Sequence, residues 1–187
     1  MDERKWIERI LAGDTQSFSC LVAKYEKMAY TIALRILENR EEAEEAVQDA
    51  FVKMYRALSD FHFDSKFSTW FYRIVYRTAL TALRQQRMFV SYEEAGPVDL
   101  SNDEVESATA LLEREDRKEM IARPLKKLPA DEALLLTLYY LEECSVEEIC
   151  QITELSASNV KVKLFRGRKR FYEVLQDKMK LETADLL

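Results

Sequence analysis

Six basic side chains crowd into residues 155–172 (LSASNVKVKLFRGRKRFY), a segment that contains no acidic residue. A basic cluster of this kind, in a chain whose net charge is −6, predicts contact with a nucleic acid. A solvated helix face would have the same composition, so the run alone leaves both interpretations open. The six residues are Lys161, Lys163, Arg166, Arg168, Lys169 and Arg170.

A second candidate nucleic-acid contact is the segment 67–84 (FSTWFYRIVYRTALTALR), where aromatic residues alternate with arginines. Aromatic rings stack on unpaired bases and cations hold phosphates, so this mixture suits single-stranded nucleic acid. Phe67, Phe71 and Ile74 can face a core, which leaves Tyr72 and Arg73 on other faces, together with Tyr76, Arg77 and Arg84. The alternative is that Trp70 and the tyrosines only pack, with their polar tips in water.

Enzyme chemistry finds little support in the sequence. His62 is the only histidine, and Cys20, Cys144 and Cys150 form no CxxC pair, so we expect no metal site. A Gly-rich phosphate loop and a nucleophile elbow are both missing. We therefore expect a non-catalytic protein without a cofactor.

The composition predicts an all-α protein. Hydrophobic residues make up 48% of the 187, but only 3 Gly and 3 Pro interrupt the chain, far fewer turn residues than an all-β fold needs. No apolar run approaches the ~20 residues of a membrane span, and the first residues do not resemble a signal peptide. We expect a soluble, cytoplasmic protein.

The charge is unevenly distributed and predicts two domains. Residues 91–110 carry six acidic and no basic groups, which equals the net charge of the whole chain. This stretch also holds Gly96 and Pro97 and lacks apolar periodicity, as is typical of a linker. We therefore expect helical domains at 1–90 and 111–187, joined by an acidic, flexible linker at 91–110.

Helical periodicity locates the elements that must position these residues. In the first domain, apolar residues recur at helical spacing over 18–36, 43–58 and about 68–87, and a short helix is expected near Trp6. In the second, the apolar segment 131–141 predicts a buried helix, and Ser145 with Glu148 forms a capping-box pattern. A turn at 153–155 and a basic helix from Ser156 to about Lys178 complete a helix-turn-helix, whose second helix reads the major groove of DNA.

Several of these segments, in the same order, resemble one family. The chain is similar to the extracytoplasmic-function (ECF) sigma factors of bacterial RNA polymerase, a group within the sigma-70 family. The resemblance rests on AEEAVQDAFVKMYRAL (43–58), on 67–84, and on LPADEALLLTLYYLEECSVEEIC (128–150) followed by NVKVKLFRGRKRF (159–171). It covers nearly everything from Asp14 to Tyr172 and implies a sigma factor that binds core polymerase, recognises −10 and −35 promoter elements and helps melt the −10 region.

The resemblance also implies which residues touch which partner. The helix over 43–58 would dock on the clamp helices of the polymerase β′ subunit through Gln48, Asp49, Phe51, Lys53, Tyr55 and Arg56. The −10 element, read as unpaired bases, would be held by Phe61, His62, Phe63, Asp64, Ser65, Lys66, Trp70, Arg73, Tyr76, Arg77 and Arg84. This chain has Arg77 and Thr81 where the family commonly has Asn and Asp.

In the second domain, the resemblance places base-edge or adjacent contacts to the −35 element at Lys161, Val162, Phe165 and Arg166. Phosphate contacts are implied for Lys163, Arg168 and Arg170. Ser158 and Asn159 stand where the family often has Gly-Thr. Asn159 either reads an adenine or supplies a capping amide, and both alternatives stay open.

The partners implied are core RNA polymerase, including its β′ clamp helices and β subunit, promoter DNA, and an anti-sigma factor that covers these surfaces. The main rival is a stand-alone helix-turn-helix repressor, which needs affinity for free duplex DNA. The near-neutral domains make that electrostatic term weak. A helical adaptor that binds only protein would leave the basic cluster unexplained.

Overall fold

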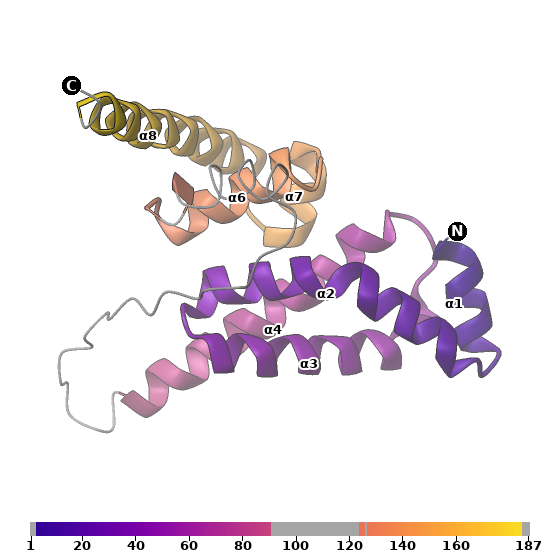
Figure 1. Cartoon of the computed structure of the whole chain (residues 1–187). Helices are drawn as coiled ribbons and strands as arrows, with labels where there is room; N and C mark the ends of the chain where they lie inside the picture. Colours follow the sequence, from indigo (N-terminus) through magenta and orange to yellow (C-terminus); the bar gives the residue numbers. More distant parts are fainter. Residues whose placement is uncertain (1–2, 91–123, 126, 185–187) are drawn as a thin grey trace.

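The computed structural model describes residues 3–90, 124–125 and 127–184, and in this part of the chain every regular element is helical (Figure 1). The all-α prediction is thus confirmed. The expected linker, 91–110, lies outside the described residues. The elements are α1 (Glu3–Leu11), α2 (Thr15–Leu37), α3 (Arg40–Arg56), the 3-10 turn η1 (Leu58–Asp60), α4 (Phe67–Val90), α6 (Ala130–Tyr140), α7 (Val146–Thr153) and α8 (Ala157–Ala184).

Helices α2, α3 and α4 pack on one another, and α1 covers α2 and η1. Side chains cap the helices where the sequence changes direction: the Asp14 carboxylate accepts the Gln16 N–H at 3.0 Å, and the Asn39 amide oxygen accepts the Glu42 N–H at 3.1 Å. The apolar stripes of the three long helices meet in a core. Its most completely buried large side chains include Phe71, Leu21, Ile32, Met54 and Val75.

The second lobe is built on α6, whose apolar residues are buried from Ala133 to Leu138. Helix α7 begins with the predicted capping box: the Ser145 hydroxyl accepts the Glu148 N–H, and the Glu148 carboxylate accepts the Ser145 N–H at 2.8 Å. Glu154 makes the turn in the left-handed conformation (φ 61°) that a glycine commonly provides.

Helix α8 begins at the predicted cap, where the Ser156 hydroxyl accepts the Asn159 N–H at 3.3 Å. Gly167 lets α8 lie against α6, because a Cβ there would meet Leu136 Cδ1 at 3.2 Å. Together α7, the turn and α8 form the expected helix-turn-helix.

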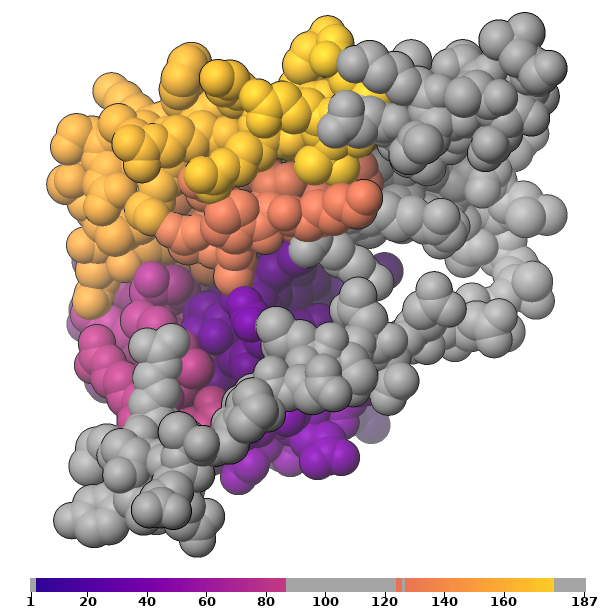
Figure 2. Space-filling model, turned by 90° about the vertical axis from the view of Figure 1, so that its left-hand side faces the viewer, coloured from indigo at the N-terminus to yellow at the C-terminus, as the bar shows by residue number. Residues whose placement is uncertain are grey.

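The two lobes pack directly on each other, α4 against α7 and α2 against α6. Figure 2 shows the atoms of the second lobe (orange) seated on those of the first (magenta and indigo). One expectation from the sequence is wrong here: Tyr72, assigned to a face away from the core, is only 2% exposed. The second lobe covers it, a contact that helical periodicity within one domain cannot reveal.

Candidate polymerase and nucleic-acid interfaces

Helix α3 presents a polar face to solvent. Gln48, Asp49, Lys53 and Arg56 are exposed, and Tyr55 is half-exposed beside the Phe18 ring, with the two centroids 5.1 Å apart. On the same helix, the exposure of Phe51 and Val52 differs from what the sequence predicts.

Phe51, also predicted to touch polymerase, is only 8% exposed and packs against Phe71 in the core, with the ring centroids 4.8 Å apart. Val52 is 47% exposed on the same face as Gln48 and Arg56, four residues away on either side. The sequence analysis missed Val52, since an isolated valine in an amphipathic helix is ordinarily assigned to the core.

A polar groove runs between α3 and α4. Lys53 crosses it and donates to Thr78 Oγ1 at 3.2 Å, and Gln86 donates to Glu42 Oε1 at 2.8 Å. The groove thus joins the α3 face to a stretch of α4. Its lining consists of Glu42, Glu45, Ala46, Asp49, Lys53, Thr78, Thr81, Ala82, Gln85 and Gln86.

The loop before α4 carries a cluster of aromatic rings. Phe61 is buried, with its ring centroid 5.0 Å from that of Trp70 and 4.7 Å from that of Phe63. Phe63 is partly exposed in a left-handed backbone conformation (φ 61°), which turns its ring outward. Arg4 of α1 places its guanidinium 4.9 Å above that ring. No sequence signal links Arg4 to a loop nearly sixty residues away.

The remaining loop residues predicted to hold DNA differ in accessibility. His62, Asp64 and Lys66 are exposed and Ser65 is half-buried. On α4, Trp70, Arg73 and Tyr76 are half-buried, and Arg77 and Arg84 are exposed. Of the whole predicted −10 set, Phe61 alone is fully buried, so it supports the loop from below.

Lys66, immediately before α4, and two residues of α4 meet acidic residues of the second lobe. Lys66 Nζ lies 3.0 Å from Glu148 Oε1, and the Tyr72 hydroxyl donates to Glu142 at 2.8 Å. Arg77 donates through Nε to Glu154 at 2.7 Å.

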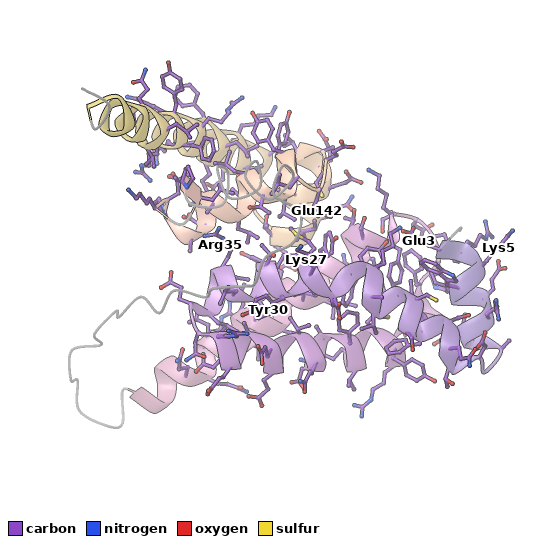
Figure 3. The ribbon with its side chains drawn as sticks, in the orientation of Figure 1. Glu3, Lys5, Lys27, Tyr30, Arg35 and Glu142 are labelled. Carbon is purple, nitrogen blue, oxygen red and sulfur yellow. The ribbon has the colours of Figure 1, made fainter. Side chains whose placement is uncertain are left out.

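A second contact ties α2 to the chain just before α6. The Arg35 guanidinium donates to the Leu125 carbonyl at 3.3 Å. Figure 3 shows Arg35 and Glu142 at the boundary between the two lobes.

The inter-lobe boundary shifts several pKa values. Partial burial would raise the pKa of Glu148, but hydrogen bonds from Ser145 and Lys66 outweigh burial and lower it. The same carboxylate raises the pKa of Lys66. Burial, and then the hydrogen bond to Glu142, raise the pKa of Tyr72, which keeps its hydroxyl protonated.

The first turns of α8 point most of the predicted −35 contacts into solvent. Phe165 is 64% and Val162 46% exposed. Ser158, Asn159, Lys161 and Arg166 are exposed too. The Ser156 hydroxyl caps the backbone N–H of Asn159, and Asn159 as a residue is exposed.

The three predicted phosphate contacts of α8 are partly engaged elsewhere. Lys163 pairs with Asp131, and Arg170 lies 2.8 Å from the buried carboxylate of Glu132, both on α6. Arg168 is exposed and donates to the carbonyl one turn earlier in its own helix. Arg170 therefore has a folding role that the sequence analysis did not anticipate.

The C-terminal end of α6 is more exposed than the sequence predicts. The segment 131–141 is expected to be buried throughout, but Tyr139, Tyr140 and Leu141 are 37%, 52% and 53% exposed. They lie beside the start of α8, where Tyr139 and Tyr140 line a depression together with Val146, Lys161, Leu164 and Arg168. When apolar residues lie on every face of a helix, the sequence pattern does not indicate which end of the helix is exposed.

Two negative findings apply to the described residues. None of their helices is long and apolar enough to cross a membrane. No three of their His, Cys, Asp or Glu side chains come together as metal ligands would. The fold and its surfaces define a two-lobed helical protein whose second lobe carries a helix-turn-helix with an exposed basic second helix.

Comparison with known proteins places the chain more narrowly. Residues 21–88 match the family model of sigma-70 region 2, and residues 118–171 match that of sigma-70 region 4. The RNA polymerase sigma-H factor of Pseudomonas aeruginosa is 31% identical over 93% of this chain and 94% of its own. The ECF RNA polymerase sigma-E factor of Escherichia coli K12 is 30% identical over 87% and 88%.

Solved structures show the same fold. The sigma factor RpoE of Bartonella quintana, in complex with the anti-sigma factor NepR, superposes with a TM-score of 0.68 at 18% identity, covering 86% of this chain and 98% of that one. CnrH, in complex with the cytosolic domain of CnrY, superposes with a TM-score of 0.60 at 20% identity, covering 94% and 97%.

The chain belongs to the sigma-70 family, in its extracytoplasmic-function group. It is a sigma factor: a non-catalytic specificity subunit that binds core RNA polymerase and directs transcription initiation at particular promoters.

Proposed function

We propose that the three interfaces divide the work of promoter recognition as follows. The exposed face of α3, Val52 included, docks on the clamp helices of the polymerase β′ subunit. The 61–66 loop and α4 bind the unpaired −10 strand, and the first turns of α8 read the −35 element. The protein acts in the cytoplasm, where bacterial core polymerase works.

One observation above all supports this division: the base-reading positions of α8 are exposed, while its neighbouring cations are tied to α6. Lys161 and Arg166 make no ion pair among the described residues, whereas Lys163 and Arg170 do. A recognition helix needs this arrangement, because side chains that read bases must reach the groove while others fix the helix in its lobe.

The 61–66 loop supports the −10 assignment. Extruding a base from a duplex costs a few kcal/mol, and stacking recovers about 1–3 kcal/mol per base. Phe63, raised on buried Phe61 and flanked by Arg4, offers an outward ring and a nearby cation for that purpose.

An anti-sigma factor is the remaining proposed partner. Two neighbours in the structural comparison are complexes, RpoE with the anti-sigma factor NepR and CnrH with a domain of CnrY. The exposed tyrosines at the end of α6, with Val162 and Phe165 of α8, form an apolar surface on the second lobe that such a partner can cover.

The test is run-off transcription with purified bacterial core polymerase on fragmented genomic DNA from the source organism, with and without the protein. Discrete new transcripts are expected, and their start sites give the −10 and −35 elements directly. Transcripts that depend on the protein but share no −35 sequence would contradict the assignment of α8.

A further inference from the structure

The first turn of α1 contacts the loop assigned to the −10 element. The guanidinium carbon of Arg4 lies 4.9 Å from the centroid of the Phe63 ring, and Arg4 Nε donates to Glu8 Oε1 at 3.2 Å. The Glu8 carboxylate thus holds Arg4 from its own helix while the guanidinium covers one face of the ring. Helix α1 precedes residues 21–88, which match sigma-70 region 2, so the family match assigns this helix no task.

The same turn of α1 is also fixed to the aromatic cluster beneath the loop. Glu3 accepts a hydrogen bond from the hydroxyl of Tyr25, a residue that is only 3% exposed. The Tyr25 ring centroid lies 5.3 Å from that of Phe67, which in turn lies 5.5 Å from that of Phe61. Because Glu3 and Arg4 are consecutive, one helical turn contacts the cluster at both its buried and its exposed end.

Phe63 occupies a position that needs such support. Its φ of 61° is unfavourable for a bulky side chain, and the residue is 39% exposed. A base that stacks on an unsupported ring would first have to fix the rotamer of that ring. A cation on one ring face removes part of this cost in advance, since the ring is already held where the base must find it.

We propose that Arg4 is a positioning residue for capture of an unpaired −10 base: it acts through Phe63, whose ring it holds outward, and makes α1 part of the −10 interface. The inference rests on the proposed assignment of the 61–66 loop to the −10 element. It distinguishes Arg4 from cations that bind phosphates of the strand directly. The Arg4 side chain is 64% exposed, so its replacement should not unfold the protein.

The experiment compares Arg4→Gln with the matched control Lys5→Gln. Both remove one positive charge from exposed, neighbouring residues of α1, and Lys5 makes no ion pair among the described residues. Figure 3 shows Lys5 on the side of α1 opposite Glu3. Arg4→Lys tests rescue, since an ammonium also binds the face of an aromatic ring, and Phe63→Leu removes the ring. Circular dichroism and thermal unfolding verify that each variant is folded.

The first readout is the Phe63 ring itself in the free, full-length protein. Biosynthetic labelling with para-fluorophenylalanine makes the phenylalanine rings visible by fluorine NMR, and Phe63→Leu identifies the Phe63 signal by its loss. We expect Arg4→Gln to shift this signal and Lys5→Gln to leave it in place. An unchanged Phe63 signal in Arg4→Gln would overturn the proposal.

The second readout is the yield of abortive transcripts from holoenzyme, on promoters that run-off transcription has identified. We expect Phe63→Leu to lower the yield at least about fivefold. Arg4→Gln should lower it about two- to fivefold, Arg4→Lys should recover most of that loss, and Lys5→Gln should match wild type. Arg4→Gln combined with Phe63→Leu should be no weaker than Phe63→Leu alone, because no ring is left to hold.

The outcomes separate this inference from the proposed function. If wild type initiates no transcription, or if Phe63→Leu matches wild type, the −10 assignment of the loop fails and the inference fails with it. If Phe63→Leu is defective but Arg4→Gln equals Lys5→Gln, only the positioning role fails. A double variant weaker than Phe63→Leu by the whole factor of Arg4→Gln would show that Arg4 binds DNA by itself, which also contradicts the proposal.

Discussion

Lys66 and Glu148 are 82 positions apart in the chain, yet the Lys66 ammonium lies 3.0 Å from the Glu148 carboxylate. The same carboxylate accepts the Ser145 N–H at 2.8 Å. One side chain therefore begins α7 and also joins the two lobes, and the ion pair with Lys66 requires its ionised form.

The first prediction concerns pH. Because folding lowers the pKa of Glu148, its contribution to the contact between the lobes is complete above its usual pKa of about 4.5 and is lost as pH falls through the lowered value. Because folding raises the pKa of Lys66, its contribution is complete below about 10.5. The radius of gyration should be constant from about pH 5 to 9 and increase in acid. A transition near pH 7 would contradict this account.

Arg170→Ala should destabilise the protein. The substitution leaves the Glu132 carboxylate, whose side chain is 7% exposed, buried without its cation. We expect a loss of about 1–3 kcal/mol in urea unfolding, with the lower end favoured because the Arg170 side chain is half-exposed. Combining it with Glu132→Gln should recover part of the loss. Full stability of the single variant would show that the pair contributes nothing.

Arg166→Ala and Arg168→Ala should separate base reading from phosphate binding. Arg166 lies on the exposed face of α8 assigned to base edges, so its removal should reduce discrimination among −35 variants by about 1–3 kcal/mol at one position. Arg168→Ala should weaken all promoters alike. Transcription from a panel of −35 substitutions measures both effects, and identical profiles for the two variants would contradict the division.

Val52→Glu should weaken polymerase binding without unfolding the chain. Val52 is 47% exposed, so a glutamate costs little in the free protein but places a charge inside the proposed contact with polymerase. Affinity for core polymerase should fall at least tenfold in a pull-down titration, about 1.4 kcal/mol. Thermal unfolding supplies the control and should be unchanged within a few degrees.

Cys144 should be the slowest of the three thiols to react. Burial, followed by the nearby Glu148 and Glu142 carboxylates, raises its pKa from 9.0 to about 11, which lowers the thiolate population about 100-fold. Cys20 is exposed and Cys150 half-buried. With N-ethylmaleimide at pH 7.5, mass spectrometry should find Cys20 modified first and Cys144 last. Urea should remove the difference.

Local patterns predicted most of the individual helices. Capping signals at Ser145 and Ser156 and the 3.6-residue periodicity of α2 and α3 depend only on neighbours in sequence, so the structure confirms them. The turn at 153–155 was also predicted, although no glycine marks it; that Glu154 adopts the left-handed conformation is seen only in the structure.

Contacts between segments that are distant in the chain could not be predicted from the sequence. Burial of Tyr72 depends on α7, the position of Arg4 depends on how α1 packs, and the role of Arg170 depends on one carboxylate of α6. Each of these residues is polar or aromatic and fits a surface pattern equally well. Only tertiary packing decides between a nucleic-acid contact and an internal partner.

Arg77 and Glu154 differ from the other pairs between the lobes. Neither side chain is buried, and the Glu154 side chain is 55% exposed at a turn, so the folding of each lobe does not depend on their contact. Single substitutions at this pair can therefore change how firmly the two lobes hold together while the fold of each lobe stays intact.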